Sequence, residues 1–114
     1  MNDAPLSYSR ATGGRDGLVV ISLTGPLTLR NIFQLQQDLA ANPPQLTIID
    51  LSGVPYMDSA GIGVLINYYV SAEKNGRRIA LSGANERIGA LLDMTKVREL
   101  LRCFPTVAEA EAAV

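Results

Sequence analysis

Residues 48–65 read IIDLSGVPYMDSAGIGVL and contain the end of a strand, a loop and the start of a helix in succession. The run 45–51, QLTIIDL, is short, apolar and β-branched, which is typical of a buried strand in a parallel or mixed sheet. After the loop, apolar residues recur with the spacing of an amphipathic helix: Ile62, Leu65, Ile66 and Tyr69. Ser59 therefore lies where the loop meets the helix, and this junction is the candidate site.

The sequence before this junction predicts a hairpin and a helix. Two extended stretches flank a glycine-rich turn at residues 13–17, and the second stretch is apolar enough to be a central strand. Thr28 is a suitable N-cap for the helix that follows, and the Asn-Pro-Pro at 42–44 ends it. The expected helix face consists of Leu29, Ile32, Phe33 and Gln36, with Leu35 and Leu39 beside it.

The sequence after the junction continues the alternation. The helix from Ser59 ends near Gly76, and residues 77–83 form the next strand. Asn85 caps a further helix, a helical turn then leads into a short extended piece, and Thr106 with Glu109 forms the capping box of a last helix. The apolar face expected for the helix after Asn85 is Ile88, Leu91 and Leu92. This order predicts an α/β fold with right-handed crossovers and a mixed sheet.

Length and composition limit the classes of protein. A chain of 114 residues favours one domain, taken as residues 7–114 after a mobile tail of residues 1–6. Ten basic and eleven acidic residues leave no excess of positive charge, which argues against nucleic-acid binding. The single cysteine excludes an intrachain disulfide and favours a reducing, cytoplasmic location. The longest apolar runs are too short for membrane insertion, and the first ten residues have no signal-peptide core.

The chemistry around Ser59 argues against an enzyme. The chain has no histidine, so the base of a Ser-His-Asp hydrolase and the commonest transition-metal ligand are both missing. The sequence GIG at 61–63 lacks the remainder of a phosphate-binding loop, and no cofactor is predicted. Two roles stay open for Ser59. It is either a helix cap, or, with Asp58 as the cap, an exposed hydroxyl to which another enzyme transfers a phosphate.

The central segment resembles the STAS domain family, the anti-sigma factor antagonists of bacteria. The family pattern is an apolar strand, then D-L-S-G-V, a short loop and D-S-x-G-[LI]-G, and residues 48–65 follow it. GANERI at 83–88 and FPTVAEA at 104–110 also match the second half of the family pattern. The resemblance spans about residues 7–112 and implies a mixed sheet of four or five strands with helices packed on one side.

The resemblance also implies a function. In such regulators the serine corresponding to Ser59 is phosphorylated by an anti-sigma factor that is a serine kinase of the GHKL type. The unphosphorylated antagonist binds this kinase and frees the sigma factor, and a PP2C-type phosphatase resets the switch. The implied partner-binding residues are Asp50, Asp58, Ser59, Ala60, Gly61, Ile62 and Thr28. An alternative is a constitutive STAS subunit of a larger assembly, such as a stressosome-like scaffold or a lipid-transport ATPase.

The chain departs from the family pattern at two of these positions. Thr28 stands where the family often has an aspartate, so it can cap a helix but supplies no negative charge. Ala60 stands where a second Ser or Thr is common, which leaves Ser59 as the expected phosphorylation site.

Overall fold

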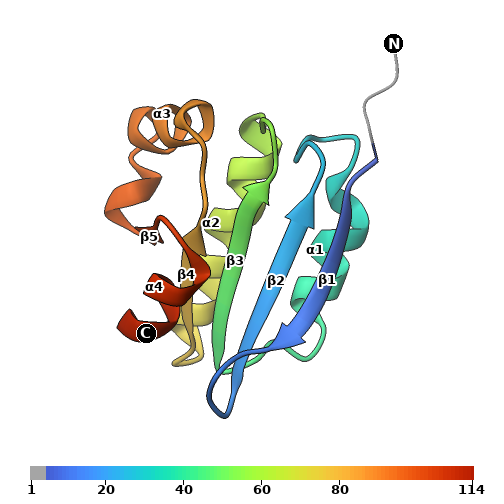
Figure 1. Cartoon of the computed structure of the whole chain (residues 1–114). Coiled ribbons are helices and arrows are strands. Elements are labelled where there is room, and N and C mark those ends of the chain that lie inside the picture. The colour runs from blue at the N-terminus through green and yellow to red at the C-terminus, as the bar shows by residue number, and fades with distance from the viewer. Residues whose placement is uncertain (1–4) are drawn as a thin grey trace.

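The computed structural model describes residues 5–114, which form one five-stranded sheet and its covering helices (Figure 1). The elements follow the predicted order, and their bounds are β1 Ser7–Thr12, β2 Leu18–Thr24, α1 Ile32–Ala40, β3 Leu46–Gly53, α2 Ser59–Lys74, β4 Arg78–Ser82, α3 Glu86–Met94, the 3₁₀ helix η1 Val97–Glu99, β5 Arg102–Phe104 and α4 Val107–Ala113. Most of the expected tail lies outside the described residues. Of the two described residues before β1, Leu6 packs against the core.

The sheet is mixed, as expected. Its strand order is β1-β2-β3-β4-β5, with β1 antiparallel to β2 and the other neighbouring pairs parallel. The carboxyl ends of β2, β3 and β4 therefore share one edge, and α1, α2 and α3 start near it (Figure 1). Ser59 is the first residue of α2, so the candidate site lies at this edge.

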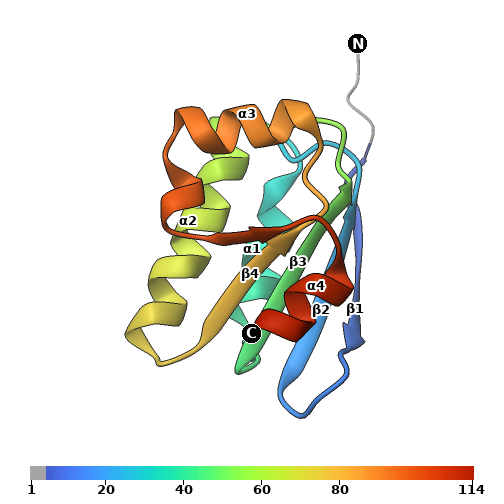
Figure 2. The ribbon, with the colours of Figure 1, turned by 60° about the vertical axis from the view of Figure 1, so that its left-hand side comes forward.

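The helices cover both faces of the sheet unequally. The expectation of helices on one side holds for α1 and α2, which share the main core with β2 and β3. The short helix α4 lies on the opposite face (Figure 2), because Ala110 packs against Leu18 and Ile48. Along β3 the side chains alternate, so Ile49 faces the main core and Ile48 faces α4.

The expected face of α1 is wrong in part. Ile32, Leu35 and Leu39 are buried, but Leu29 and Phe33 are 59% and 64% exposed. The helix begins at Ile32, so Leu29 belongs to the preceding turn and does not extend the helical row. Successive residues on a helix lie about 100° apart, and Phe33 is therefore turned away from the buried stripe that Ile32 begins.

Two of the three predicted caps are confirmed, and the structure assigns the cap of α2, which the sequence left open. Asn85 accepts a hydrogen bond from Ile88 N, and Thr106 accepts one from Glu109 N. Asp58 caps α2. Thr28 does not cap α1, because the chain makes a further turn in which Asn31 N donates to the backbone carbonyl of Thr28.

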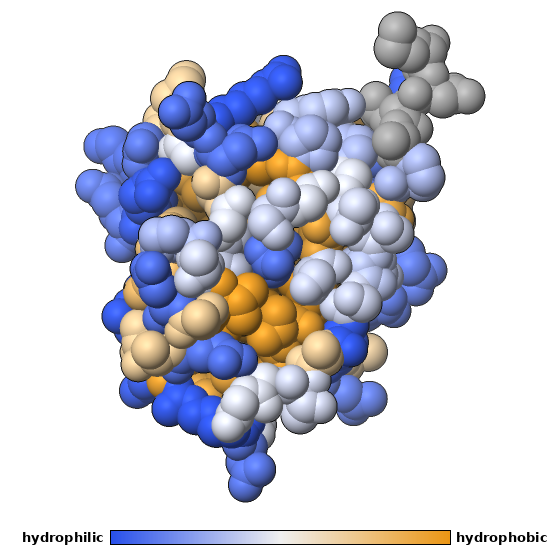
Figure 3. Space-filling model, viewed as in Figure 1, coloured by the Kyte–Doolittle hydropathy of each residue, from blue (hydrophilic) through white to orange (hydrophobic). Residues whose placement is uncertain are grey.

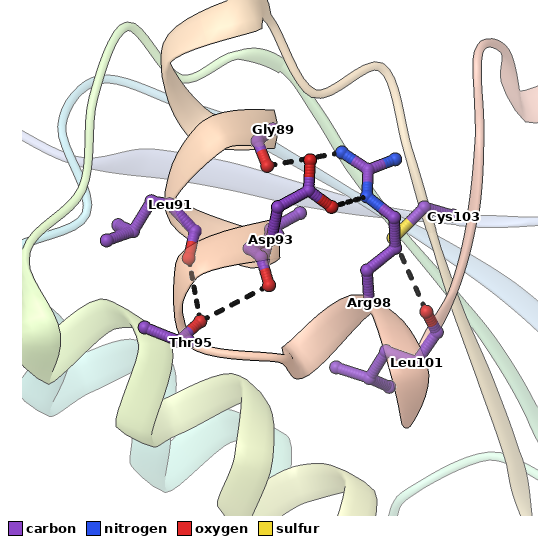
Figure 4. Close-up of polar contacts among 8 residues, drawn as sticks. Gly89, Leu91, Asp93, Thr95, Arg98, Leu101 and Cys103 are labelled. Atoms are coloured by element: carbon purple, nitrogen blue, oxygen red, sulfur yellow. Dashed lines mark hydrogen bonds and ion pairs between the residues drawn. The ribbon is translucent and has the colours of Figure 1, made fainter.

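Arg98 fixes the connection between α3 and η1 (Figure 4). Its Nε donates to Asp93 Oδ1 over 2.6 Å and its Nη2 donates to Gly89 O over 3.2 Å. Lys96 adopts a left-handed conformation between the two helices, with φ of 62°. The predicted helical turn and short strand are both present, and α3 lies across the end of the sheet (Figure 2).

Candidate functional site at the start of α2

Asp58 holds together the two loops that form the site. Its Oδ1 accepts hydrogen bonds from Ala60 N and Gly61 N, at 3.0 and 3.1 Å. Its Oδ2 accepts one from Leu29 N at 3.1 Å, in the loop before α1. A carboxylate at this position also interacts favourably with the helix dipole. Asp58 therefore caps α2 and ties the β2–α1 loop to it.

Because Asp58 caps the helix, Ser59 is left as the first helical residue with an exposed side chain. A serine at this position adds no cap bond of its own, so the cap role falls to Asp58 and the phosphorylation of Ser59 stays a prediction. Ala60 is half-buried next to it and carries no hydroxyl. An enzyme approaching this edge would therefore meet the hydroxyl of Ser59 beside the carboxylate of Asp58.

Asp50 belongs to a different group of side chains. Its two oxygens accept hydrogen bonds from Ser52 N, Ser52 Oγ and Ser82 Oγ, at 3.1, 3.1 and 3.3 Å. It alternates with Ile49 along β3 and so shares the α4 face of the sheet, not the α2 face. The register places it in a row across four strands with Ser9, Ser22 and Ser82. Figure 3 views this face, where pale, weakly polar side chains adjoin an orange apolar area.

Three of the expected partner-binding residues lie below the surface. Thr28 is 7% exposed, and its hydroxyl has no hydrogen-bond partner within residues 5–114. Gly61 and Ile62 are buried in the first turn of α2. A Cβ on Gly61 would lie 2.5 Å from Leu27 O, so this glycine permits the close approach of the β2–α1 loop. Of the expected set, Asp58 and Ser59 are exposed, and Ala60 and Asp50 are half-buried.

Two exposed apolar residues belong to the row that the sequence predicted for the first helix. Leu29 is joined to Asp58 through its backbone N–H, and Phe33 lies in the first turn of α1. Aromatic residues are enriched at protein interfaces, and Phe33 is an exposed one. The sequence carried no signal for this exposure, because it depends on the turn in which Asn31 N donates to Thr28 O and so delays the start of α1.

Within residues 5–114 no three side chains of the His, Cys, Asp and Glu types gather in a way that could hold a metal ion. Burial raises the pKa of the Cys103 thiol, and nearby Arg98 opposes that shift only in part. The thiol therefore stays protonated near neutral pH and is a weak nucleophile. None of the described helices has the length and apolar content needed to cross a membrane.

Asp58→Ala is expected to lower the free energy of unfolding by about 1–2 kcal/mol, because α2 loses its cap and the loop loses its tie. Asp58→Asn keeps an oxygen acceptor and should retain most of the stability. Glu73→Ala, at an exposed position of the same helix, removes the same charge and serves as control. Urea denaturation would measure all three, and equal midpoints for Asp58→Ala and Glu73→Ala would contradict the capping role.

Known proteins resemble this chain in sequence and in fold. An anti-sigma-B factor antagonist of Staphylococcus epidermidis is 27% identical over 89 residues, covering 75% of this chain and 82% of the relative. The crystal structure of an anti-sigma factor antagonist from Mycobacterium paratuberculosis superposes with a TM-score of 0.82 and 23% identity, covering 95% of this chain and 94% of the other.

The same fold also occurs in a protein of a transport family. The crystal structure of a sulfate transporter family protein from Wolinella succinogenes superposes with a TM-score of 0.73 and 25% identity, covering 87% of this chain and 85% of the other. The sequence model of the STAS domain matches residues 10–110. With the mixed sheet, the Asp58 cap and this match in place, the chain belongs to the STAS domain family.

Proposed function

We propose that this protein is an anti-sigma factor antagonist switched by phosphorylation of Ser59. With a bare hydroxyl, the single domain of residues 7–114 binds an anti-sigma factor that is a serine kinase of the GHKL type, and so releases a sigma factor. Phosphate transfer to Ser59 ends this binding, and a PP2C-type phosphatase restores it. The protein acts in the cytoplasm by binding, with no catalysis of its own. The names of the staphylococcal relatives support the general role.

The observation that carries the proposal is that Asp58 caps α2 while Ser59 stays exposed. Asp58 alone makes the cap bonds, so the exposed Ser59 hydroxyl is not needed to hold the helix. A group that is exposed and structurally dispensable can be modified without unfolding the domain. A phosphate there would carry a charge of about −1.5 to −2 at neutral pH, enough to change recognition at the surface.

The surroundings of Ser59 suit a protein partner better than a small substrate. Leu29 and Phe33, each more than half exposed, supply apolar area before and in the first turn of α1, and Leu29 N donates to the carboxylate of Asp58. Ser59 lines neither the cavity between α1 and α2 nor the smaller cavity beside Gly14 and Glu111. Exposed aromatic side chains beside a modifiable hydroxyl suit a regulated protein interface.

Incubation with the purified anti-sigma kinase and Mg-ATP should add one phosphate to the wild-type chain, and phosphopeptide mapping should place it on Ser59. Ser59→Ala should remain unlabelled. Ser52→Ala, which removes an exposed hydroxyl on the other side of the β3–α2 loop, should be labelled like the wild type. Full labelling of Ser59→Ala would overturn the assignment of the switch.

The second candidate function is a constitutive STAS subunit of a larger assembly. The likeness to a sulfate transporter family protein favours it, because that fold serves there as part of a transport protein. Affinity purification of the tagged chain from its own organism distinguishes the two. Recovery of a soluble kinase supports the switch, and recovery of membrane transport subunits supports the alternative.

A further inference from the structure

A cavity of about 570 Å³ lies between α1 and α2 at the end of the sheet opposite to Ser59. Its volume falls within the range of about 300–1,000 Å³ that is usual for small-molecule sites. One wall is apolar and comes from α1 and the loop after it, with Leu39, Ala40 and Pro43. The facing wall comes from the second half of α2 and the loop after it, with Tyr68, Ser71 and Arg77.

Arg77 is the one charged residue among the described residues that line this cavity. Its Nη2 donates to Ser71 Oγ at 2.9 Å and to Ser71 O at 3.2 Å, and its guanidinium lies 5.9 Å from the centre of the Tyr68 ring. Its Nη1 is buried and has no hydrogen-bond partner within residues 5–114. Such a nitrogen carries part of a positive charge, and leaving it unpaired is costly.

The residues that line this cavity indicate the chemical class of ligand that would fit it. The lining contains no Asp or Glu among the described residues, so the guanidinium is not neutralised there. Nη2 already donates to Ser71, so a carboxylate oxygen would accept from Nη1, whereas a doubly charged phosphate would find only one cation. Leu39, Pro43 and Val64 offer apolar contact, and the amides of Gln36 and Asn67 offer hydrogen bonds.

We propose that this cavity binds a small organic carboxylate, with its carboxylate on Arg77 and its apolar body between α1 and α2. The site is separate from the switch: Ser71 follows Ser59 by twelve residues on α2, about 18 Å along the helix at 1.5 Å per residue. The proposal does not depend on the proposed function, and binding would leave Ser59 accessible.

The test uses two probes of nearly equal shape, naphthalene-2-acetate and naphthalene-2-acetamide, titrated into the full chain and followed by ¹H–¹⁵N NMR. The carboxylate should shift the backbone signals of Gln45, Ser71 and Arg77, and should bind about tenfold or more tightly than the amide. Arg77→Gln should remove this preference. Arg78→Gln loses the same charge from the exposed neighbouring residue and should keep it.

Arg77→Lys keeps the positive charge but removes the planar guanidinium. It should therefore retain only part of the preference for the acid over the amide, provided that its spectrum is that of a folded chain. Three results would overturn the proposal. They are the absence of binding by either probe at millimolar concentration, equal affinities for acid and amide, and equal effects of Arg77→Gln and Arg78→Gln. Equal affinities would mean that the carboxylate does not contact the guanidinium of Arg77. Ser59→Ala should bind the probe as the wild type does, so this test and that of the switch can fail independently.

Discussion

Ser59→Glu is expected to bind the anti-sigma partner about 100-fold more weakly than the wild type, whereas Ser59→Ala retains binding. A 100-fold loss corresponds to about 2.7 kcal/mol, the size of one desolvated electrostatic mismatch. The glutamate would stand beside Asp58, whose oxygens already accept from Ala60 N and Gly61 N. The two backbone donors are therefore not available to the new carboxylate, and its negative charge acts on the bound partner instead.

The folded state should tolerate the same substitution. A glutamate in the first turn interacts favourably with the helix dipole, by about 0.3–1 kcal/mol, which offsets its repulsion by Asp58. We expect a melting temperature within about 5 °C of the wild type. Ser9→Glu adds an equal charge at an exposed position of β1 and should bind normally. Isothermal titration with purified partner measures each affinity, and equal values for Ser59→Glu and Ser59→Ala would falsify the switch.

Leu65→Ala is expected to lower the free energy of unfolding by about 2–5 kcal/mol, because Leu65 is fully buried and its truncation leaves a cavity in the main core. Domains of this size are stable by only about 5–15 kcal/mol, so the loss is a large share. Chemical denaturation gives the value.

Val70→Ala is the matched control for that measurement. It truncates an apolar side chain of the same helix that is 43% exposed, and should change stability by about 0.5 kcal/mol or less. If Leu65→Ala kept the midpoint of the wild type, α2 would not bury the face that its sequence indicates.

The sequence was sufficient for the bounds of α2, because apolar residues recur regularly over sixteen residues. Of the predicted face, Ile66 and Tyr69 are only half-buried. The sequence left the cap open between Ser59 and Asp58, and the structure assigns it to Asp58.

The alternation of side chains along β3 fixes the face of Asp50, because neighbouring residues such as Ile49 and Asp50 point to opposite sides of the sheet. We expected Asp50 at the recognition surface with Ser59. It lies on the α4 face, where it accepts hydrogen bonds from Ser52 and Ser82, and its role in partner binding stays a prediction.

Other features depend on contacts between distant parts of the chain. Thr28 looked like a cap because its type suits that position, but the turn to Asn31 moved the start of α1 and buried the threonine. The seven residues of α4 are mainly alanine and glutamate, a pattern too weak to choose a face of the sheet. The cavity beside Arg77 exists only when α1 and α2 have packed, and its wall cannot be predicted from either helix alone.

The strand order affects the rate at which the chain folds. Every strand pairs with the strand that precedes or follows it in sequence, so no pairing joins segments separated by more than one connection. The entropy lost in closing a loop grows with the logarithm of loop length, and this order avoids the longest closures. Kinetically, the sheet can assemble by successive addition of neighbours, in keeping with the intermediate rates of mixed α/β domains.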